Sequence, residues 1–279
     1  MSKTILITGA TGNQGGATLH NLLGKGFALR ALTRTPDSEK ARALANNGVE
    51  VVQGDLNDVE SLKKALAGAW GVYAVQNTWE AGVTAEEEQG KRIAELAKQV
   101  GVEHFVYASV GSAHRETGIP HFDNKGRVED TVRSLGFAST VILRPVFFME
   151  NLVSPWFLNG DKLVSTLAPE TRLQMIAVED IGTFGALAFT RAAELNGREL
   201  DLAGDAVTLP EAAATIGREL GRPLEYLRIP ISEVRKNSED FALMLEWFDS
   251  TGYNADIAGL EREFGVKLTT LEQWARKRA

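Results

Sequence analysis

Three glycines at a fixed spacing near the start of the sequence could bind a phosphate group. Residues 9–15 (GATGNQG) place Gly9, Gly12 and Gly15 in a G-x-x-G-x-x-G pattern. Between a strand and a helix, such glycines allow a tight turn, close approach of the backbone to a pyrophosphate, and close helix–strand packing. Free N–H groups and the positive end of the following helix then face the phosphates. The sequence therefore predicts dinucleotide contacts at Gly9, Thr11, Gly12, Asn13 and Gln14.

The residue that follows the second predicted strand indicates which dinucleotide is bound. NAD-binding proteins usually carry an acidic residue there, about 20 residues after the glycine loop, to bind the ribose 2′-hydroxyl. This sequence instead has Thr33-Arg34-Thr35, and the nearest acid, Asp37, lies beyond a proline. Because a guanidinium forms paired, charge-assisted hydrogen bonds with a phosphate, Arg34 favours NADP(H). The alternative is a solvated surface arginine.

Two further strand ends carry polar residues that could contact the cofactor. Asp55 and Leu56 follow the third predicted strand, where an adenine would lie, and the Asp55 carboxylate can accept a hydrogen bond from its amino group. Gln76 and Asn77 follow the fourth predicted strand, so they are expected at the same edge of a parallel sheet. Either pair could instead cap its own loop. We expect all four residues to contact the cofactor.

The elements that must position these residues are strands that alternate with helices. Apolar runs predict strands at residues 4–8, 28–34, 49–53, 70–76, 105–109 and 140–144, with helical periodicity between them. This alternation indicates an α/β fold, a Rossmann-type doubly wound parallel sheet with helices on both faces. The glycine loop occupies the first strand-to-helix turn, which favours a phosphate site over a purely structural turn.

The pattern changes after Pro145. Short predicted strands (162–167, 200–202, 224–229) mix with predicted helices (179–193, 210–220, 240–248), and seven of the eight prolines lie at or after Pro120. We therefore expect an NADP(H)-binding Rossmann domain over residues 1–146. A smaller C-terminal α+β lobe over residues 147–279 is expected to pack on it and to serve a substrate or partner. The crevice between the two is the expected ligand site.

Composition excludes several classes of function. The sequence has no cysteine, which removes disulfides, thiolate nucleophiles and Cys-ligated zinc or iron–sulfur sites. Its four histidines are far apart, so no transition-metal site is expected. The net charge of −7 argues against nucleic acid or an anionic membrane as the main partner. No apolar run approaches a membrane span, and the first strand begins too early for a signal peptide, so we expect a cytoplasmic protein.

Taken together, six segments resemble the NmrA-like branch of the atypical short-chain dehydrogenase/reductase superfamily. They are GATGNQGG (9–16), TRTP (33–36), VVQGDLND (51–58), QNTWE (76–80), HFDNKG (121–126) and LRPVFFMENL (143–152). The similarity is strongest over residues 3–158. It is closest to the NADP(H)-binding redox-sensor type, which shares the HFD-x-KG segment.

The resemblance implies a Rossmann fold that binds NADP(H) on the glycine loop, with Arg34 at the 2′-phosphate. It further implies that Lys125 and Asn151 lie near the nicotinamide ribose. One departure concerns the run of three glutamates at residues 86–88. Relatives can carry a lysine near the cofactor where this sequence has Glu88, so one possible cation is missing.

The wider superfamily uses a catalytic Tyr-x-x-x-Lys pair on one helix face, and this sequence lacks it. None of its four tyrosines has a lysine four residues later. His121 and Lys125 have that spacing instead, so His121 could replace the tyrosine as proton donor or could be an ordinary residue at a helix N-terminus. Lys125 could also act alone, as in the related isoflavone-reductase type. Ser109 and Ser112 follow the fifth strand, where reductases place a hydroxyl on the substrate carbonyl, although serine is also an ordinary strand-end residue.

Two classes of function are consistent with this sequence. The first is an NADPH-dependent reductase of a quinone, enone or carbonyl compound, with Lys125, His121 and Ser109 as candidate catalytic residues. The second is a non-catalytic sensor of the NADPH/NADP ratio that acts through a protein partner. A small-molecule substrate and a protein partner both stay open, and so does a homodimer.

Overall fold

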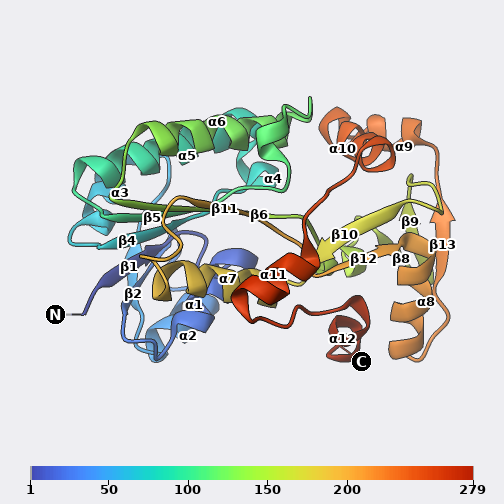
Figure 1. The fold of residues 1–279 in the computed structure, drawn as a ribbon, viewed down its shortest axis with the longest axis horizontal. Coiled ribbons are helices and arrows are strands. Elements are labelled where there is room, and N and C mark those ends of the chain that lie inside the picture. The colour runs from blue at the N-terminus through green and yellow to red at the C-terminus, as the bar shows by residue number, and fades with distance from the viewer. Residues whose placement is uncertain (1, 279) are drawn as a thin grey trace.

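The computed structural model describes residues 2–278 and is built around a parallel sheet of seven strands (Figure 1). The strand order is β11-β6-β5-β4-β1-β2-β3. The strands are β1 (Thr4–Ile7), β2 (Ala28–Thr33), β3 (Glu50–Gln53), β4 (Gly71–Ala74), β5 (His104–Ala108), β6 (Ser139–Pro145) and β11 (Arg198–Leu202). The chain order reverses on the two sides of β1, between β2 and β4. In open α/β sheets such a switch point creates a ligand crevice at the carboxyl ends of the strands.

Helices cover both faces of this sheet (Figure 1). One face carries α3 (Val59–Leu66), α5 (Val83–Gln99) and α6 (Pro120–Ser134). The other face carries α1 (Asn13–Leu22), α2 (Glu39–Asn46) and α7 (Val178–Thr190). Because the sheet is covered on both sides, its central strands consist mainly of apolar residues, with His104 at the start of β5 as a buried exception. All of β4 and β5 is buried.

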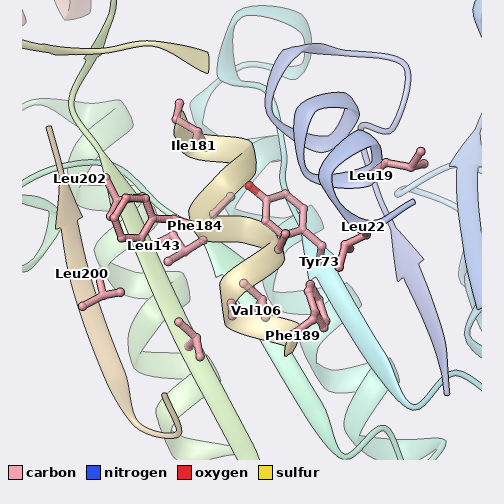
Figure 2. Packing of buried hydrophobic residues seen from close by; sticks show 14 of the residues in the cluster. Leu19, Leu22, Tyr73, Val106, Leu143, Ile181, Phe184, Phe189, Leu200 and Leu202 are labelled. Carbon is pink, nitrogen blue, oxygen red and sulfur yellow. The ribbon is translucent and has the colours of Figure 1, made fainter. Parts of the chain in front are cut away.

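Helix α7 packs closely on the central sheet through a cluster of buried apolar side chains (Figure 2). Phe184 and Phe189 of α7 pack against Tyr73 of β4 and other buried sheet residues. Burial of each large apolar side chain contributes about 1.5–3 kcal/mol. Helix α7 also packs on α1, and Gly182 makes this possible: a Cβ added there would lie 2.6 Å from the backbone of Ala17.

The second part of the chain forms two small sheets and several short helices. One sheet has the order β12-β10-β7 and the other β13-β9-β8. Their strands are β7 (Phe147–Phe148), β8 (Leu158–Asn159), β9 (Lys162–Ser165), β10 (Arg172–Ile176), β12 (Asp205–Thr208) and β13 (Glu225–Arg228). The helices are α8 (Leu209–Glu219), α9 (Ile231–Arg235), α10 (Glu239–Ser250), α11 (Ile257–Phe264) and α12 (Leu271–Arg276). Short segments complete the chain: α4 (Thr78–Ala81), η1 (Ala113–Arg115) and η2 (Met149–Val153).

The predicted fold class is confirmed, and each of the six predicted strands of the first half exists within about two residues of its predicted bounds. The seventh strand, β11, joins the sheet beside β6, although it comes from the second half of the chain. Helix α7 also follows residue 146 and covers the same sheet. The central sheet and its covering helices therefore include residues from before and after the predicted boundary at residue 146. Residues 1–146 and 147–279 are thus not separate in space.

Within residues 2–278, no helix is both long enough and apolar enough to cross a lipid bilayer.

Candidate functional site

A single cleft of about 860 Å³ follows the carboxyl ends of β1, β2 and β4 and continues between the sheet and the second half of the chain. Every residue predicted to contact the cofactor or to act in catalysis lines it. These residues are Gly9, Thr11, Gly12, Asn13, Gln14, Arg34, Asp55, Leu56, Gln76, Asn77, Ser109, His121, Lys125 and Asn151. The structure thus brings together segments that are up to about half the chain apart. Ser112 is buried and does not line the cleft.

The glycine loop has the geometry that phosphate binding requires. Gly9 has a positive φ of 59°, a conformation that favours glycine. A Cβ on Gly15 would lie 2.4 Å from the carbonyl oxygen of Thr8, so this position allows α1 to pack on β1. Gly12 is the N-cap of α1, and no side chain caps this helix. The first N–H groups of α1 therefore remain available to an anion at the positive end of the helix.

Arg34 follows β2 at one side of the cleft and pairs with Glu80 of α4 on the other side. The side chains of Arg34 and Glu80 are 62% and 52% exposed, so the pair is solvated. The hydrogen bond to Glu80 and the attraction between the charges raise the pKa of Arg34 above its ordinary value. Since β1 lies between β2 and β4 in the sheet, the pair crosses the groove in front of the glycine loop. The Arg34 guanidinium, which was predicted to bind a 2′-phosphate, is therefore already paired with the Glu80 carboxylate.

Two buried amide groups in the cleft have atoms without a partner, which fits a bound ligand with many polar groups. Gln76 is 6% exposed, and neither its Oε1 nor its Nε2 has a hydrogen-bond partner. The Oε1 atom of Gln14 in the glycine loop is also buried and unpaired. A buried amide without a partner costs about 1–3 kcal/mol. Asn77 differs, because its side chain caps α4 by accepting from the N–H of Trp79 at 3.1 Å.

Lys125 is held in the cleft by a buried carboxylate that the sequence analysis did not single out. Its Nζ lies 2.7 Å from Oε1 of Glu86, whose side chain is 1% exposed. Glu86 also accepts hydrogen bonds from Thr78 and, at 2.9 Å, from Asn124. Burial alone would raise the pKa of Glu86, but the charge of Lys125 and these hydrogen bonds hold it below its ordinary value. Glu88, the predicted replacement for a cation, is exposed and outside the cleft, so Glu86 is the glutamate of this run that faces the site.

Ser109 is committed to a buried ion-pair network. Its hydroxyl donates a hydrogen bond of 2.5 Å to Glu129, which also accepts from Arg144 at 2.8 and 2.6 Å. Glu129 and Arg144 are almost fully buried. The Ser109 hydroxyl is therefore oriented by the network below the cleft and not by the cleft itself. Ser112 has a left-handed φ of 66° and donates its backbone N–H to Asp201.

His121 pairs with an aspartate that sequence reasoning missed. Asp240, near the start of α10, accepts from both the backbone N–H and the ring Nδ1 of His121. The two side chains are 9% and 17% exposed. Aromatic rings surround this pair: the Trp79 ring is 5.2 Å from that of His121 and 5.9 Å from that of Phe241.

The tyrosines do not restore the missing Tyr-x-x-x-Lys pair. Tyr73 and Tyr107 are buried within the sheet, and burial raises the pKa of Tyr73 to about 12. Tyr253 lines the cleft, but burial raises its pKa well above the ordinary value, and its ring stacks on Phe122. All three hydroxyls keep their protons at neutral pH.

The chain is similar to several known proteins. The model of the NmrA-like family matches residues 1–276. An NmrA-like family domain-containing protein of Dictyostelium discoideum is 26% identical over 99% of this chain and 98% of its own length. An NmrA-like family domain-containing oxidoreductase of Aspergillus versicolor is 32% identical over 75% of this chain and 67% of its own length. The chain spans about half the length of some other fungal oxidoreductases that it matches.

Two solved structures have a similar fold along almost the whole chain. The NADPH-dependent quinone oxidoreductase QOR2 of Escherichia coli, complexed with NADPH, is 25% identical, with a TM-score of 0.81 and coverage of 98% of this chain and 99% of its own. The negative transcriptional regulator NmrA, in complex with NADP, is 22% identical, with a TM-score of 0.81 and coverage of 99% and 95%. At that identity, the likeness to NmrA shows the fold alone.

Proposed function

The chain belongs to the NmrA-like family, and from that premise we propose that it is an NADP(H)-dependent oxidoreductase that reduces a quinone, enone or carbonyl compound. The observation that supports this function best is the continuity of the cleft. The same cavity is lined by the glycine loop at one end and by Trp79, Phe241 and Phe157 at the other. A dinucleotide and an apolar acceptor would therefore meet inside one cleft.

The residues of the cofactor half have separate roles in this proposal. The N–H groups of the first turn of α1 hold the pyrophosphate, and Arg34 binds the 2′-phosphate once Glu80 releases it. Lys125, fixed by Glu86, reaches the ribose of the nicotinamide half beside Asn151. The unpaired amides of Gln76 and Gln14 provide further donors and acceptors. When bound, the reduced nicotinamide supplies the hydride that reduces the acceptor.

The acceptor half offers aromatic surface and few charges. Besides Trp79, it is lined by Phe147, Phe148, Trp156, Phe157, Phe241 and Met244. Trp79 and Trp156 are 58% and 71% exposed, so aromatic surface stays open at the entrance. Apolar walls with few polar groups are typical of small-molecule sites. The 25% identity to a quinone oxidoreductase supports the same class of acceptor, and the curated relatives support an oxidoreductase.

A binding titration and a turnover assay test this function together. Calorimetry should find NADPH bound more tightly than NADH, and NADPH oxidation should be seen with at least one member of a panel of quinones, enones and aldehydes. Arg34→Ala should weaken NADPH binding about 10- to 150-fold, which corresponds to about 1.5–3 kcal/mol for hydrogen bonds to a charged group, and leave NADH almost unchanged. Arg42→Ala, an exposed arginine of α2 outside the cleft, is the matched control. Equal affinities for the two cofactors, or no turnover with any acceptor, would contradict the proposal.

A second candidate function is a sensor of the NADPH/NADP ratio that acts on a protein partner. The Arg34–Glu80 pair favours it, because a ligand changes the balance between two states only through contacts that differ between them. A 2′-phosphate that binds Arg34 in place of Glu80 makes such a contact. It would also release α4, which carries Glu80, from its ion pair with Arg34. If this function holds, saturation with NADPH should change the oligomeric size or the partner binding of the protein, measured by light scattering, while no acceptor is reduced.

A further inference from the structure

His121 and Asp240 link the two halves of the molecule beside the cleft, and His121 lines it. His121 belongs to the first turn of α6, which covers the central sheet, and Asp240 to the first turn of α10 in the second half. The aspartate binds both the ring and the backbone of the histidine. Two contacts from one carboxylate fix the orientation of the imidazole as well as its position.

The second nitrogen of this imidazole is free for another partner. With Nδ1 bound to Asp240, Nε2 is the remaining polar atom of the ring, and no group in residues 2–278 forms a hydrogen bond with it. His121 lines the cleft, and it lies one helical turn before Lys125 on the same face of α6. Nε2 is therefore available in the cleft, one turn away from the side chain that is expected to hold the cofactor ribose.

The ring also lies beside a cluster of aromatic side chains. Trp79 and Phe241 meet edge to face at 5.9 Å, and Phe157 lies 6.0 Å from Phe241. These rings come from both halves of the chain and all line the cleft. These rings offer apolar faces and edges against which a planar ring system can pack, with His121 beside it.

We propose that His121, held by Asp240, donates a proton from Nε2 to the oxygen of a planar aromatic carbonyl acceptor, such as a quinone, that packs against Trp79, Phe241 and Phe157. This inference rests on the proposed oxidoreductase function and assigns the proton-donating group that the missing tyrosine leaves open. Asp240 is a positioning residue, because it acts through His121 and does not touch the acceptor.

The chemical balance is simple for a quinone. Reduction adds one hydride, with its two electrons, from the reduced nicotinamide, and the acceptor then carries a negative charge on oxygen. The N–H bond at Nε2 of the imidazolium breaks, and an O–H bond forms on that oxygen. The product is a hydroquinone and neutral His121, which regains its proton from solvent.

Two substitutions at His121 test this role with 1,4-naphthoquinone as the probe. His121→Phe keeps an aromatic ring beside the cluster and removes the proton, so we expect kcat to fall about 100-fold, with KM changed less than about threefold. His121→Ala leaves a hole where an imidazole molecule fits. Added imidazole should therefore raise kcat of His121→Ala several-fold and leave His121→Phe, in which the hole is filled, unchanged.

Binding to the protein without cofactor provides a readout that does not depend on activity. Naphthoquinone should quench tryptophan fluorescence through Trp79 and Trp156, and its Kd should differ less than about threefold between His121→Phe and the unaltered protein. Asp240→Asn should lower kcat about tenfold while quinone binding is retained. The matched controls are His114→Phe, an exposed histidine outside the cleft, and Glu239→Gln, the neighbour of Asp240. Both should leave kcat unchanged.

These experiments distinguish a failure of the proposed oxidoreductase function from a failure of the role of His121. If the unaltered protein binds NADPH but reduces no acceptor, the oxidoreductase function itself is contradicted. If it reduces naphthoquinone and His121→Phe does so at the same rate, only the role of His121 is overturned. The same conclusion follows if imidazole fails to restore His121→Ala while its quinone binding is intact.

Discussion

At the scale of single residues, Glu80 decides how strongly Arg34 can attract a 2′-phosphate. The carboxylate already neutralises the guanidinium across the groove, so NADPH must displace it, whereas NADH does not need to. Exposed ion pairs are worth about 0.2–1 kcal/mol, and this is the amount by which Glu80 lowers the affinity for NADPH. Glu80 therefore reduces the preference for NADPH over NADH but does not abolish NADPH binding.

Removal of the Glu80 charge should strengthen NADPH binding. In Glu80→Gln we expect a Kd for NADPH up to about fivefold lower, which is the range of an exposed pair, with no change for NADH. Titration by cofactor fluorescence at low salt measures both. Glu60→Gln, an exposed glutamate of α3 outside the cleft, is the control. A Kd for NADPH that stays the same or rises would show that Glu80 does not compete with the phosphate.

The Lys125–Glu86 pair makes a different prediction, because both groups are buried. Lys125→Met leaves the Glu86 carboxylate without its cation and should cost about 3–5 kcal/mol of stability. The double variant Lys125→Met/Glu86→Gln should recover most of that loss. Urea unfolding at pH 7 measures the stabilities. In the double variant, NADPH and NADH should both bind more weakly than in the unaltered protein, in contrast to Arg34→Ala.

The lowered pKa of Glu86 determines whether this pair makes the protein more or less stable as the pH falls. Its pKa is lower in the folded protein than in the unfolded chain, so the carboxylate stabilises the fold at neutral pH. That contribution is lost as the pH falls through the lowered pKa. If Lys125→Met alone is as stable as the unaltered protein, the pair does not hold Lys125 in the way described here.

At the scale of elements, the contact between α1 and α7 is the tightest helix pair described above. Gly182→Ala would place a methyl group 2.6 Å from the backbone of Ala17, which cannot yield as a flexible side chain does. We expect a loss of about 1–3 kcal/mol. Thermal unfolding should show a lower Tm, by about 2–4 °C for each kcal/mol. Thr183→Ala, the next residue of α7 and exposed in part, should change the stability by less than about 0.5 kcal/mol.

His104 joins three elements and should make stability depend on pH. Its Nδ1 lies 2.8 Å from the hydroxyl of Ser139 in β6, and its Nε2 lies 2.9 Å from the carbonyl of Ala188 in α7. Burial lowers the pKa of His104 to about 4. Between pH 6.5 and 4 the unfolded chain takes up a proton and the folded protein does not, so stability falls as the pH is lowered, by up to about 3 kcal/mol.

Substitution of His104 isolates this effect. In His104→Gln the stability should change less between pH 6.5 and 4 than in the unaltered protein, as measured by urea unfolding at several pH values. His20→Gln, an exposed histidine of α1, should keep the full dependence. Equal slopes in His104→Gln and the unaltered protein would contradict a buried neutral imidazole.

At the scale of the whole molecule, the features that could be predicted from the sequence are those that depend on short stretches of neighbouring residues. The glycine loop, the strands that precede each site residue and the position of Arg34 all depend on runs of about ten residues. The partners of those residues were missed, because they come from far along the chain. Glu80 is 46 positions from Arg34, and Asp240 is 119 positions from His121. Asp240 and Glu86 look like ordinary acids at a helix N-terminus or in a charge run until the fold places Asp240 against His121 and Glu86 against Lys125.

The return of α7 and β11 to the central sheet predicts that residues 1–146 do not fold alone. This fragment lacks the edge strand beside β6 and one of the three helices that cover one face of the sheet. Its apolar core residues on that face, including Tyr73, Val106 and Leu143, would face water. Amide spectra of the isolated fragment should lack the dispersion of a folded domain, and the full chain should show it. A well-dispersed spectrum of the fragment would instead support an independent domain.

The same return also affects how the protein is made. During synthesis, the strands from β1 to β6 leave the ribosome before α7 and β11 exist. At about 5–20 residues per second, roughly 3–11 s pass between residue 146 and the end of β11. For that time the part of the nascent sheet that α7 covers is exposed, and the sheet edge at β6 is unpaired. Until its last central strand emerges, the newborn chain therefore presents apolar surface and an open strand edge to other molecules.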